Sequence, residues 1–188
     1  MFELLTGLGL ALPAGLNAYI PLLAVAMADR YTGLIHLDQP YNTLSKPVVM
    51  LVIAILLTIE LVADKIPIVD HVNDLIQSAI RPASGALLLM AATDATKSIN
   101  PIVAMLAGLV VAGCVHTAKT SFRPLVTATT GGLGNPVVSG VEDGTAIGLT
   151  VIALIAPVVI GFVLALLLVA LVLYARRRRS RRVAPTGH

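Results

Sequence analysis

The sequence predicts an all-α protein: a polytopic transmembrane helix bundle built from three tandem helical-hairpin repeats with broken or re-entrant helices. Three observations support this prediction. The 188 residues are 57% hydrophobic and only 12% charged, whereas soluble domains are about 45–50% apolar and about 25% charged. Several apolar runs approach the roughly 20 residues that a helix needs to cross a bilayer. A proline-led pattern also recurs three times along the chain, and such periodicity indicates a repeat architecture.

Each predicted repeat contains an apolar run that begins with proline and ends at a basic residue. The runs start at Pro47, Pro101 and Pro157 and close 18 or 19 positions later at Lys65, Lys119 and Arg176. The pattern predicts one transmembrane domain over residues 1–177, with repeat units at about 1–65, 66–119 and 120–177. We expect residues 178–188 to form a basic, disordered cytoplasmic tail.

A second proline, followed closely by glycine, precedes each apolar run, at Pro13, Pro82 and Pro136. Upstream of Pro82, residues 69–80 alternate polar and apolar side chains with a helical period, which predicts an amphipathic helix. Arg81-Pro82 should end it, because the residue before proline is disfavoured in the α conformation. The next helix, 83–92, would be about 15 Å long, half of a bilayer core of about 30 Å. The amphipathic helix would either lie on the membrane surface or meet this half-helix inside the membrane.

The basic residues predict an orientation. Ten of the 13 Lys and Arg residues fall on one predicted side, namely Lys65, Arg81, Lys119, Arg123 and the six arginines of Arg176–Arg182. Because excess Lys and Arg mark the cytoplasmic side, both termini are expected to be cytoplasmic. The arginine run is expected to bind anionic lipids of the bilayer. No aromatic residues interleave with it, so we predict no nucleic-acid partner.

Polar residues near the predicted breaks are candidates for a polar pathway. They are Asn17, Arg81, Ser84, Asn135, Ser139, Glu142 and Asp143. An ionisable group at the bilayer centre costs about 2.5–3.5 kcal/mol or more, so such groups normally face partners or water. Our hypothesis is that Arg81 pairs with Glu142 or Asp143 across a repeat interface. The alternative is that all of these residues cap helices at the cytoplasmic surface.

Two further groups of acidic residues are weaker candidates for a functional site. Asp64 and the nearby Glu60 are best explained as residues at the membrane interface. Asp70, Asn73 and Asp74 form a candidate cytoplasmic acidic stripe, in which two carboxylates one turn apart could face a Mg²⁺-like cation. A solvated helix face explains the stripe equally simply, and we favour it. The sequence therefore predicts no metal site, no cofactor and no catalytic residue.

Small residues recur every four positions in two segments: Gly140, Gly144 and Gly148, and Ala104, Gly108 and Ala112. This spacing lets membrane helices approach closely. We favour packing within one chain, and association into a homo-oligomer is the alternative.

Four motifs resemble a bacterial integral-membrane family that is catalogued as domain of unknown function, family 4126. They are residues 15–24 (GLNAYIPLLA), 62–74 (VADKIPIVDHVND), 81–85 (RPASG) and 135–143 (NPVVSGVED). The resemblance covers nearly the whole chain before the arginine tail. It implies a bacterial inner-membrane location and brings no known substrate, cofactor or catalytic residue.

The predicted function is transport or conduction of an ion or small solute by a small integral membrane protein. Repeats and broken helices with charges at the breaks are features of transporters, although a shared fold does not establish a function. The alternatives are a membrane scaffold or accessory protein without transport activity and, less favoured, an intramembrane enzyme that uses Asp70, Asp74 or Glu142.

Overall fold

A computed structural model describes residues 2–65, 67–94, 99–162, 165–166 and 169, and of residues 67–72 it describes the backbone alone. Within these residues every regular element is helical, as predicted. The α-helices are α1 (Phe2–Ala14), α2 (Tyr19–Met27), α3 (Pro47–Ala63), α4 (Pro67–Asp94), α5 (Pro101–Thr130) and α6 (Asn135–Ile155). A π-helical turn, Ala28–Thr32, and a 3₁₀ helix, Tyr41–Ser45, lie between α2 and α3. The predicted tail, 178–188, and its arginines lie outside the described residues.

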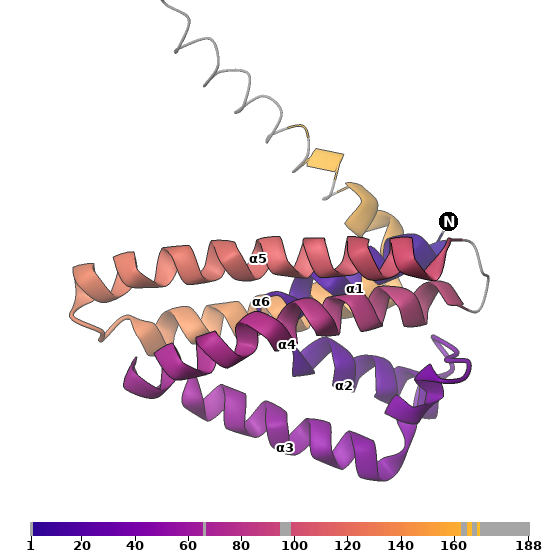
Figure 1. The fold of residues 1–188 in the computed structure, drawn as a ribbon, viewed down its shortest axis with the longest axis horizontal. Helices are drawn as coiled ribbons and strands as arrows, with labels where there is room; N and C mark the ends of the chain where they lie inside the picture. The colour runs from indigo at the N-terminus through magenta and orange to yellow at the C-terminus, as the bar shows by residue number, and fades with distance from the viewer. Residues whose placement is uncertain (1, 66, 95–98, 163–164, 167–168, 170–188) are drawn as a thin grey trace, which may run out of the picture.

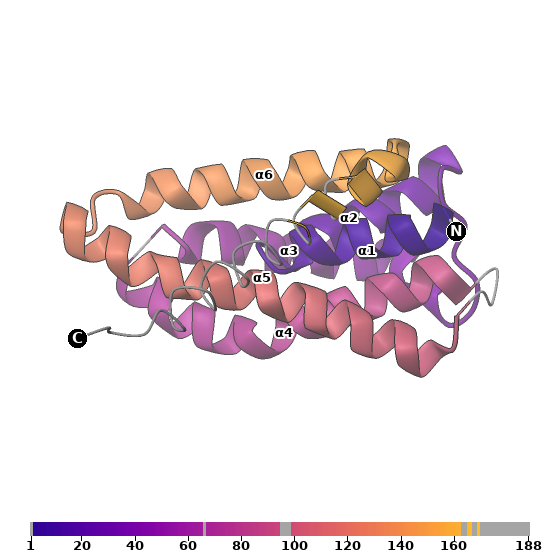
Figure 2. The same ribbon diagram turned by 90° about the horizontal axis from the view of Figure 1, so that it is seen from above.

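α1 and α2 form a short hairpin that turns back inside the bundle. α1 runs inward from the N-terminus, the chain turns at residues 15–18, and α2 returns toward the end from which α1 started (Figures 1 and 2). With 13 and 9 residues, these helices are about 20 and 14 Å long, too short to cross a bilayer core of about 30 Å. The break predicted at Pro13–Gly15 is therefore present as a turn inside the bundle, and we call α1 and α2 with this turn the re-entrant hairpin.

Gly15 lets this turn reach α5. A Cβ atom at Gly15 would lie 2.5 Å from the carbonyl oxygen of Ala112 and 2.6 Å from Cβ of Val115. Any residue larger than glycine would push the tip of the hairpin away from α5. The nearest atom is a backbone oxygen, which cannot move aside as the end of a flexible side chain can.

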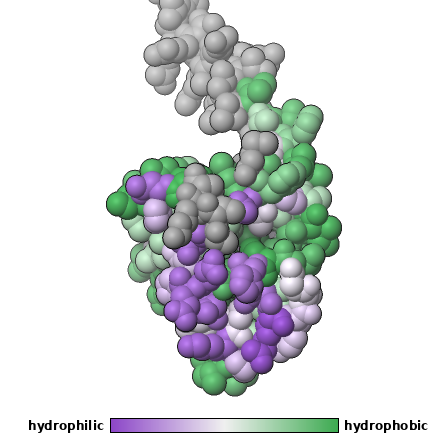
Figure 3. Space-filling model, turned by 90° about the vertical axis from the view of Figure 1, so that its right-hand side faces the viewer, coloured by the Kyte–Doolittle hydropathy of each residue, from purple (hydrophilic) through white to green (hydrophobic). Residues whose placement is uncertain are grey.

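Three described helices are long and apolar enough to span a membrane: Asn73–Asp94 within α4, α5, and α6. The lipid-facing side of the bundle is apolar, as Val48, Leu51 and Ile59 on α3 show with exposures of 72, 62 and 57%. Polar side chains instead gather on the end face that Figure 3 displays, with apolar surface around them. These features indicate a membrane protein.

α4 continues through Pro82, so the predicted break at Arg81-Pro82 and the separate half-helix 83–92 are wrong. Proline removes one helical hydrogen bond, but membrane helices tolerate this when neighbouring helices hold the segment in place. Here α5 does so: a Cβ atom at Gly108 would collide with the backbone of Gly85 and Ala86. This packing outweighs the local preference of the Arg81-Pro82 pair.

The other predicted repeat boundaries also differ from the helices. α5 passes without interruption across residue 119, where the second unit was expected to end. The predicted third break is a connection between α5 and α6, closed by Gly131 in the left-handed conformation with φ of 61°. The described helices therefore do not confirm three equivalent hairpins.

The N-terminus lies at the polar end of the bundle. A cavity there is lined by Phe2 and Glu3 together with Leu34 and His36, whereas α3 carries the chain to Lys65 at the opposite end (Figure 1). The N-terminus and Lys65 therefore lie at opposite ends of the bundle. The reason is the re-entrant hairpin, which crosses only part of the bundle before it turns back.

Candidate functional site

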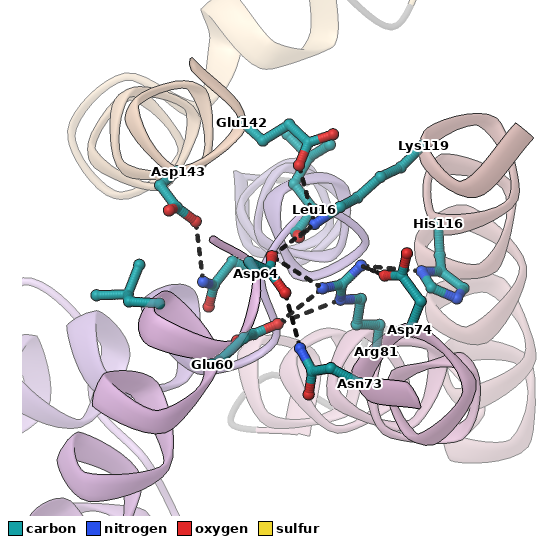
Figure 4. A network of polar contacts seen from close by, with 12 residues as sticks. Leu16, Glu60, Asp64, Asn73, Asp74, Arg81, His116, Lys119, Glu142 and Asp143 are labelled. Carbon is teal, nitrogen blue, oxygen red and sulfur yellow. Dashed lines mark hydrogen bonds and ion pairs between the residues drawn. The ribbon is translucent and has the colours of Figure 1, made fainter. Parts of the chain in front are cut away.

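A group of buried charged side chains lies where the tip of the re-entrant hairpin meets the four longer helices. We call it the charged cluster and define it by its ionisable members in the described residues: Glu60, Asp64, Asp74, Arg81, His116, Lys119, Arg123, Glu142 and Asp143. They come from the end of α3, from α4, from α5 and from α6, and the members labelled in Figure 4 point toward one another. Asn17 and Asn73 complete the group with their side-chain amides.

The cluster lies deep in the bundle. Measured along the helices from the polar end, Asp143 is 12 residues from Ile155, Arg81 is 13 from Asp94, and Lys119 is 18 from Pro101. At 1.5 Å per residue these separations are about 18, 20 and 27 Å. If the polar end marks one surface of the bilayer, the cluster lies past the midpoint of a core of about 30 Å.

Arg81 is the centre of the cluster, and its side chain is 0% exposed. Its Nε and Nη2 donate to Oε1 of Glu60 at 3.3 and 2.9 Å. Its Nη1 donates to Oδ1 of Asp74 at 3.4 Å, and Nη2 lies 3.8 Å from Oδ2 of Asp64. Nη1 also lies 3.1 Å from Nδ1 of His116. Because a guanidinium can only donate, this Nδ1 accepts, which makes the imidazole neutral.

Lys119 and Arg123 form the second half of the cluster, one turn apart on α5. The Lys119 ammonium lies 3.2 Å from Oδ2 of Asp64 and 3.0 Å from Oε2 of Glu142, and donates to the carbonyl oxygen of Leu16 at 3.0 Å. Nη2 of Arg123 contacts the same two carboxylate oxygens at 3.3 and 2.8 Å. Two cations thus hold the carboxylates of α3 and α6 together.

The hairpin presents a helix end of each polarity to the cluster. The carbonyl end of α1 meets a cation through Leu16 and Lys119. At the start of α2, Oδ1 of Asn17 accepts from the backbone N–H groups of Tyr19 and Ile20, while its Nδ2 donates to Oδ1 of Asp143 at 3.1 Å. Since helix N-termini favour anions and C-termini favour cations, both ends complement the charges that they face.

The cluster carries more acid than base. Five of its described members are carboxylates and three are the basic residues Arg81, Lys119 and Arg123. If all of these groups were ionised, the cluster would carry two more negative than positive charges, and Lys65 beside it acts on one of the carboxylates, Asp143. An uncompensated charge away from water is strongly unfavourable, so this site is suited to holding a positive species.

The structure brings most of the predicted pathway residues to this region. Asn17, Arg81, Glu142 and Asp143 belong to or contact the cluster. Ser84, Asn135 and Ser139 are buried on α4 and α6, and among the described residues they form no hydrogen bond with the cluster. The expected pairing of Arg81 with Glu142 or Asp143 is wrong. The carboxylate partners of Arg81 come from the end of α3 and from α4, whereas Glu142 contacts Lys119 and Arg123, and Asp143 contacts Asn17.

Asn135 and Ser139 nevertheless differ from each other. Asn135 accepts from the hydroxyl of Thr127 at 3.1 Å, which links the start of α6 to α5. Ser139 is 0% exposed, and its hydroxyl has no hydrogen-bond partner among the described residues. Their part in a pathway stays a prediction.

Two residues that the sequence placed at the membrane interface belong instead to the cluster. Glu60 and Asp64 are each 1% exposed. Their i, i+4 spacing, together with the 116, 119, 123 spacing on α5, was the available signal, because each set places its charges on one helix face. Sequence alone could not show that these faces meet.

The predicted acidic stripe is turned inward. Asn73 donates to Oδ1 of Asp64 at 2.7 Å, and Asp74 contacts Arg81 and Arg123; the side chain of Asp70 lies outside the described residues. On the opposite face of α4, Leu75 and Ile76 are 75 and 55% exposed. The expectation of a solvated stripe is therefore wrong for Asn73 and Asp74, because a helix in lipid turns its polar face toward protein.

The two small-residue patterns also have different surroundings. Ala104, Gly108 and Ala112 are buried, which confirms packing within the chain for α5. On α6, Cβ atoms added at Gly140 or Gly144 would meet no atom within 4 Å. The favoured packing within one chain is wrong for this second pattern in the described part of the protein.

Comparison with known proteins gives one match. A family model described as a domain of unknown function (DUF4126) matches residues 4–177, which confirms the resemblance seen in the four motifs. No curated protein matches the chain. No solved structure matches it either.

Proposed function

Since the chain belongs to the domain of unknown function family DUF4126, whose description names no activity, we propose its function from the geometry: it transports or conducts an ion or small solute across the membrane. The charged cluster is the site through which the transported species, or an ion coupled to it, passes. One observation carries the proposal: nine ionisable side chains meet beneath a re-entrant turn, deep in an otherwise apolar bundle.

The energetic argument starts from the cost of burying these groups. Breaking a buried ion pair is strongly destabilising, yet replacing the whole pair with apolar residues is often neutral or stabilising. Stability alone therefore gives little reason for Arg81, Lys119 and Arg123 with their carboxylates. Ionisable residues inside membrane segments commonly mark paths for ions, protons or substrates.

The re-entrant hairpin supports the same function. Membrane transporters commonly build their sites from interrupted helices whose free ends face the bound species. Here the ends of α1 and α2 face Lys119 and Asp143. The proposal rests on this arrangement and not on a threefold repeat, which the described helices do not confirm.

Reconstitution into lipid vesicles tests the proposal. Purified wild-type protein is assayed for flux with a panel of protons, alkali cations, halides and small organic solutes. We expect flux of at least one species, and a reduction of about tenfold or more in Glu142→Gln. Glu142 accepts charge-assisted contacts from Lys119 and Arg123, each worth about 1.5–3 kcal/mol, and 1.4 kcal/mol corresponds to about tenfold.

Asp38→Asn is the matched control. Asp38 lies in the connection at the polar end, and its side chain is 52% exposed, so loss of its charge should leave flux unchanged. Both variants must elute from a sizing column and unfold as the wild type does. A folded wild-type protein that shows no flux with the whole panel would contradict transport and favour the scaffold alternative.

We also propose an orientation in a cell inner membrane, with the Lys65 end facing the cytoplasm. The basis is the positive-inside rule, applied to the exposed Lys65. Arg81, Lys119 and Arg123 do not count toward this rule, because they are buried beside carboxylates and are not loop charges. In this orientation the N-terminus lies on the opposite side. An enzyme is not our proposal, since Asp74 and Glu142 are both ion-paired with Arg123.

A further inference from the structure

Glu60 is bound asymmetrically. Its Oε1 accepts both Nε and Nη2 of Arg81, whereas its Oε2 has no hydrogen-bond partner among the residues that the structure describes. The side chain is 0% exposed, so bulk water does not supply the missing partner. A buried acceptor without a donor is unfavourable. The cost is greater for Glu60, because the one cation that contacts it, Arg81, also contacts Asp64 and Asp74.

A second acceptor in the same region also lacks a donor. Gln77 is 2% exposed, and its Oε1 has no partner within the described part of the chain. It precedes Arg81 by one helical turn on the buried face of α4. Both atoms present lone pairs without hydrogens, so what the site lacks is a positive or hydrogen-bearing species.

The other ion-paired carboxylates are better compensated than Glu60. Asp64 contacts Arg81, Lys119 and Arg123, and Glu142 contacts the last two. The groups that act on Glu60 are Tyr19 on α2, Asp64 at the end of its own helix, Arg81 on α4 and Lys119 on α5. Asp74 on α4 and His116 on α5 contact Arg81. Among these, only Arg81 contacts it directly.

We propose that Oε2 of Glu60 carries an exchangeable proton. On uptake, a proton delivered from water forms an O–H bond with Oε2, and the neutral acid keeps Oε1 as the acceptor for Arg81. On release, that bond breaks and the proton returns to water, leaving the carboxylate. This proton removes one of the two excess negative charges of the cluster and turns an unpartnered acceptor into a donor.

A proton fits this position better than a metal ion. Divalent cations of the Ca²⁺ and Mg²⁺ type take about six or more oxygen ligands, whereas Glu60 faces the nitrogen atoms of Arg81. In the described residues, no group of three or more His, Cys, Asp or Glu side chains is placed to hold a metal. A proton needs only the one free oxygen.

Infrared spectroscopy of the full chain tests the proton directly. A buried carboxylic acid gives a C=O stretching band that shifts in D₂O, and ionised carboxylates lack it. The chain has only three glutamates, Glu3, Glu60 and Glu142, so ¹³C-glutamate labelling assigns a band to this small set. At neutral pH we expect a band in the wild type that shifts on glutamate labelling.

The band should disappear in Glu60→Gln and persist in the matched variant Glu142→Gln, because Glu142 is ion-paired with two cations. Glu60→Gln should fold well, since glutamine is neutral and nearly isosteric with the acid. Should that variant fail to fold, the labelled wild type still decides. No glutamate band in the wild type, or a band that survives Glu60→Gln, would overturn the assignment.

The link between this proton and flux rests on the proposed function, whereas the protonation itself does not. A glutamate band without flux in any vesicle assay supports the proton site and contradicts transport. Flux without a glutamate band supports transport and contradicts the proton site.

Discussion

Arg81 holds together carboxylates from two elements at the least exposed position of the cluster. It donates to Glu60 at the end of α3 and to Asp74 on its own helix, and it lies within 3.8 Å of Asp64. Guanidinium suits this role because it presents five donors in a fixed planar arrangement, which one ammonium cannot reproduce. The position therefore depends on the shape of the side chain as well as its charge.

We predict that Arg81→Met destabilises the protein by about 3–5 kcal/mol, because it leaves buried carboxylates without their cation. The melting temperature in detergent measures this. Lys46→Met, which removes an exposed cation at the start of α3, should change stability by no more than about 0.5 kcal/mol. Adding Asp74→Asn to Arg81→Met should recover part of the loss. Equal melting temperatures for wild type and Arg81→Met would show that the network is not formed.

Asn17 has two separable roles, and variants should distinguish them. Asn17→Ala removes the acceptor for the first N–H groups of α2, a loss of about 1 kcal/mol, and also the donor to Asp143. Asn17→Asp keeps the acceptor but places a carboxylate against Asp143, so it should be at least as destabilising. The double variant Asn17→Asp with Asp143→Asn restores a complementary pair and should recover stability. A double variant no more stable than Asn17→Asp would argue against this contact.

At the scale of elements, close helix packing decides where the chain is interrupted. α4 and α5 approach at Gly85, Gly108 and Ala112 so closely that backbone meets backbone. This contact supports α4 across Pro82, whereas the Pro13–Gly15 interruption has only short helices on either side and becomes a turn. The same sequence motif therefore has two outcomes, set by its neighbours.

Gly108→Leu should separate α4 from α5 and destabilise the protein by about 1–3 kcal/mol or more, since the added atoms would meet backbone. Gly144→Leu is its control on α6, where added atoms meet open space and the expected change is within about 0.5 kcal/mol. Thermal unfolding in one detergent compares them. Similar losses in both variants would contradict the α4–α5 contact.

The sequence predicts the type of element better than the partners of each side chain. Helices, their membrane character and the first break follow from local composition and from the Pro13–Gly15 pair. That Arg81 meets Glu60 and not Glu142 does not follow, since the two acids lie 21 and 61 positions away on different helices and no local rule ranks them. The sequence also does not predict what the polar face of residues 73–81 contacts, because the pattern identifies a polar face without saying whether water or protein covers it.

At the scale of the whole molecule, the protein is apolar outside and charged within. Apolar side chains cover α3, α5 and α6 on the outside, and polar side chains gather on the end face that Figure 3 shows. The charged cluster meets the re-entrant turn through Leu16, which is labelled in Figure 4, and Asn17. This distribution of apolar and charged side chains is typical of a membrane protein.

The central claim is that the chain turns back within the membrane after α1, and labelling single cysteines in intact vesicles tests it most directly. In a Cys114→Ser background, Phe2→Cys, Leu34→Cys and Lys65→Cys each place a thiol at an exposed position. The account predicts that a membrane-impermeant maleimide labels the first two from one side and the third only from the other. Labelling of Phe2→Cys and Lys65→Cys from the same side, with Leu34→Cys opposite, would mean that α1 and α2 together make one crossing of the bilayer, and would contradict the re-entrant turn.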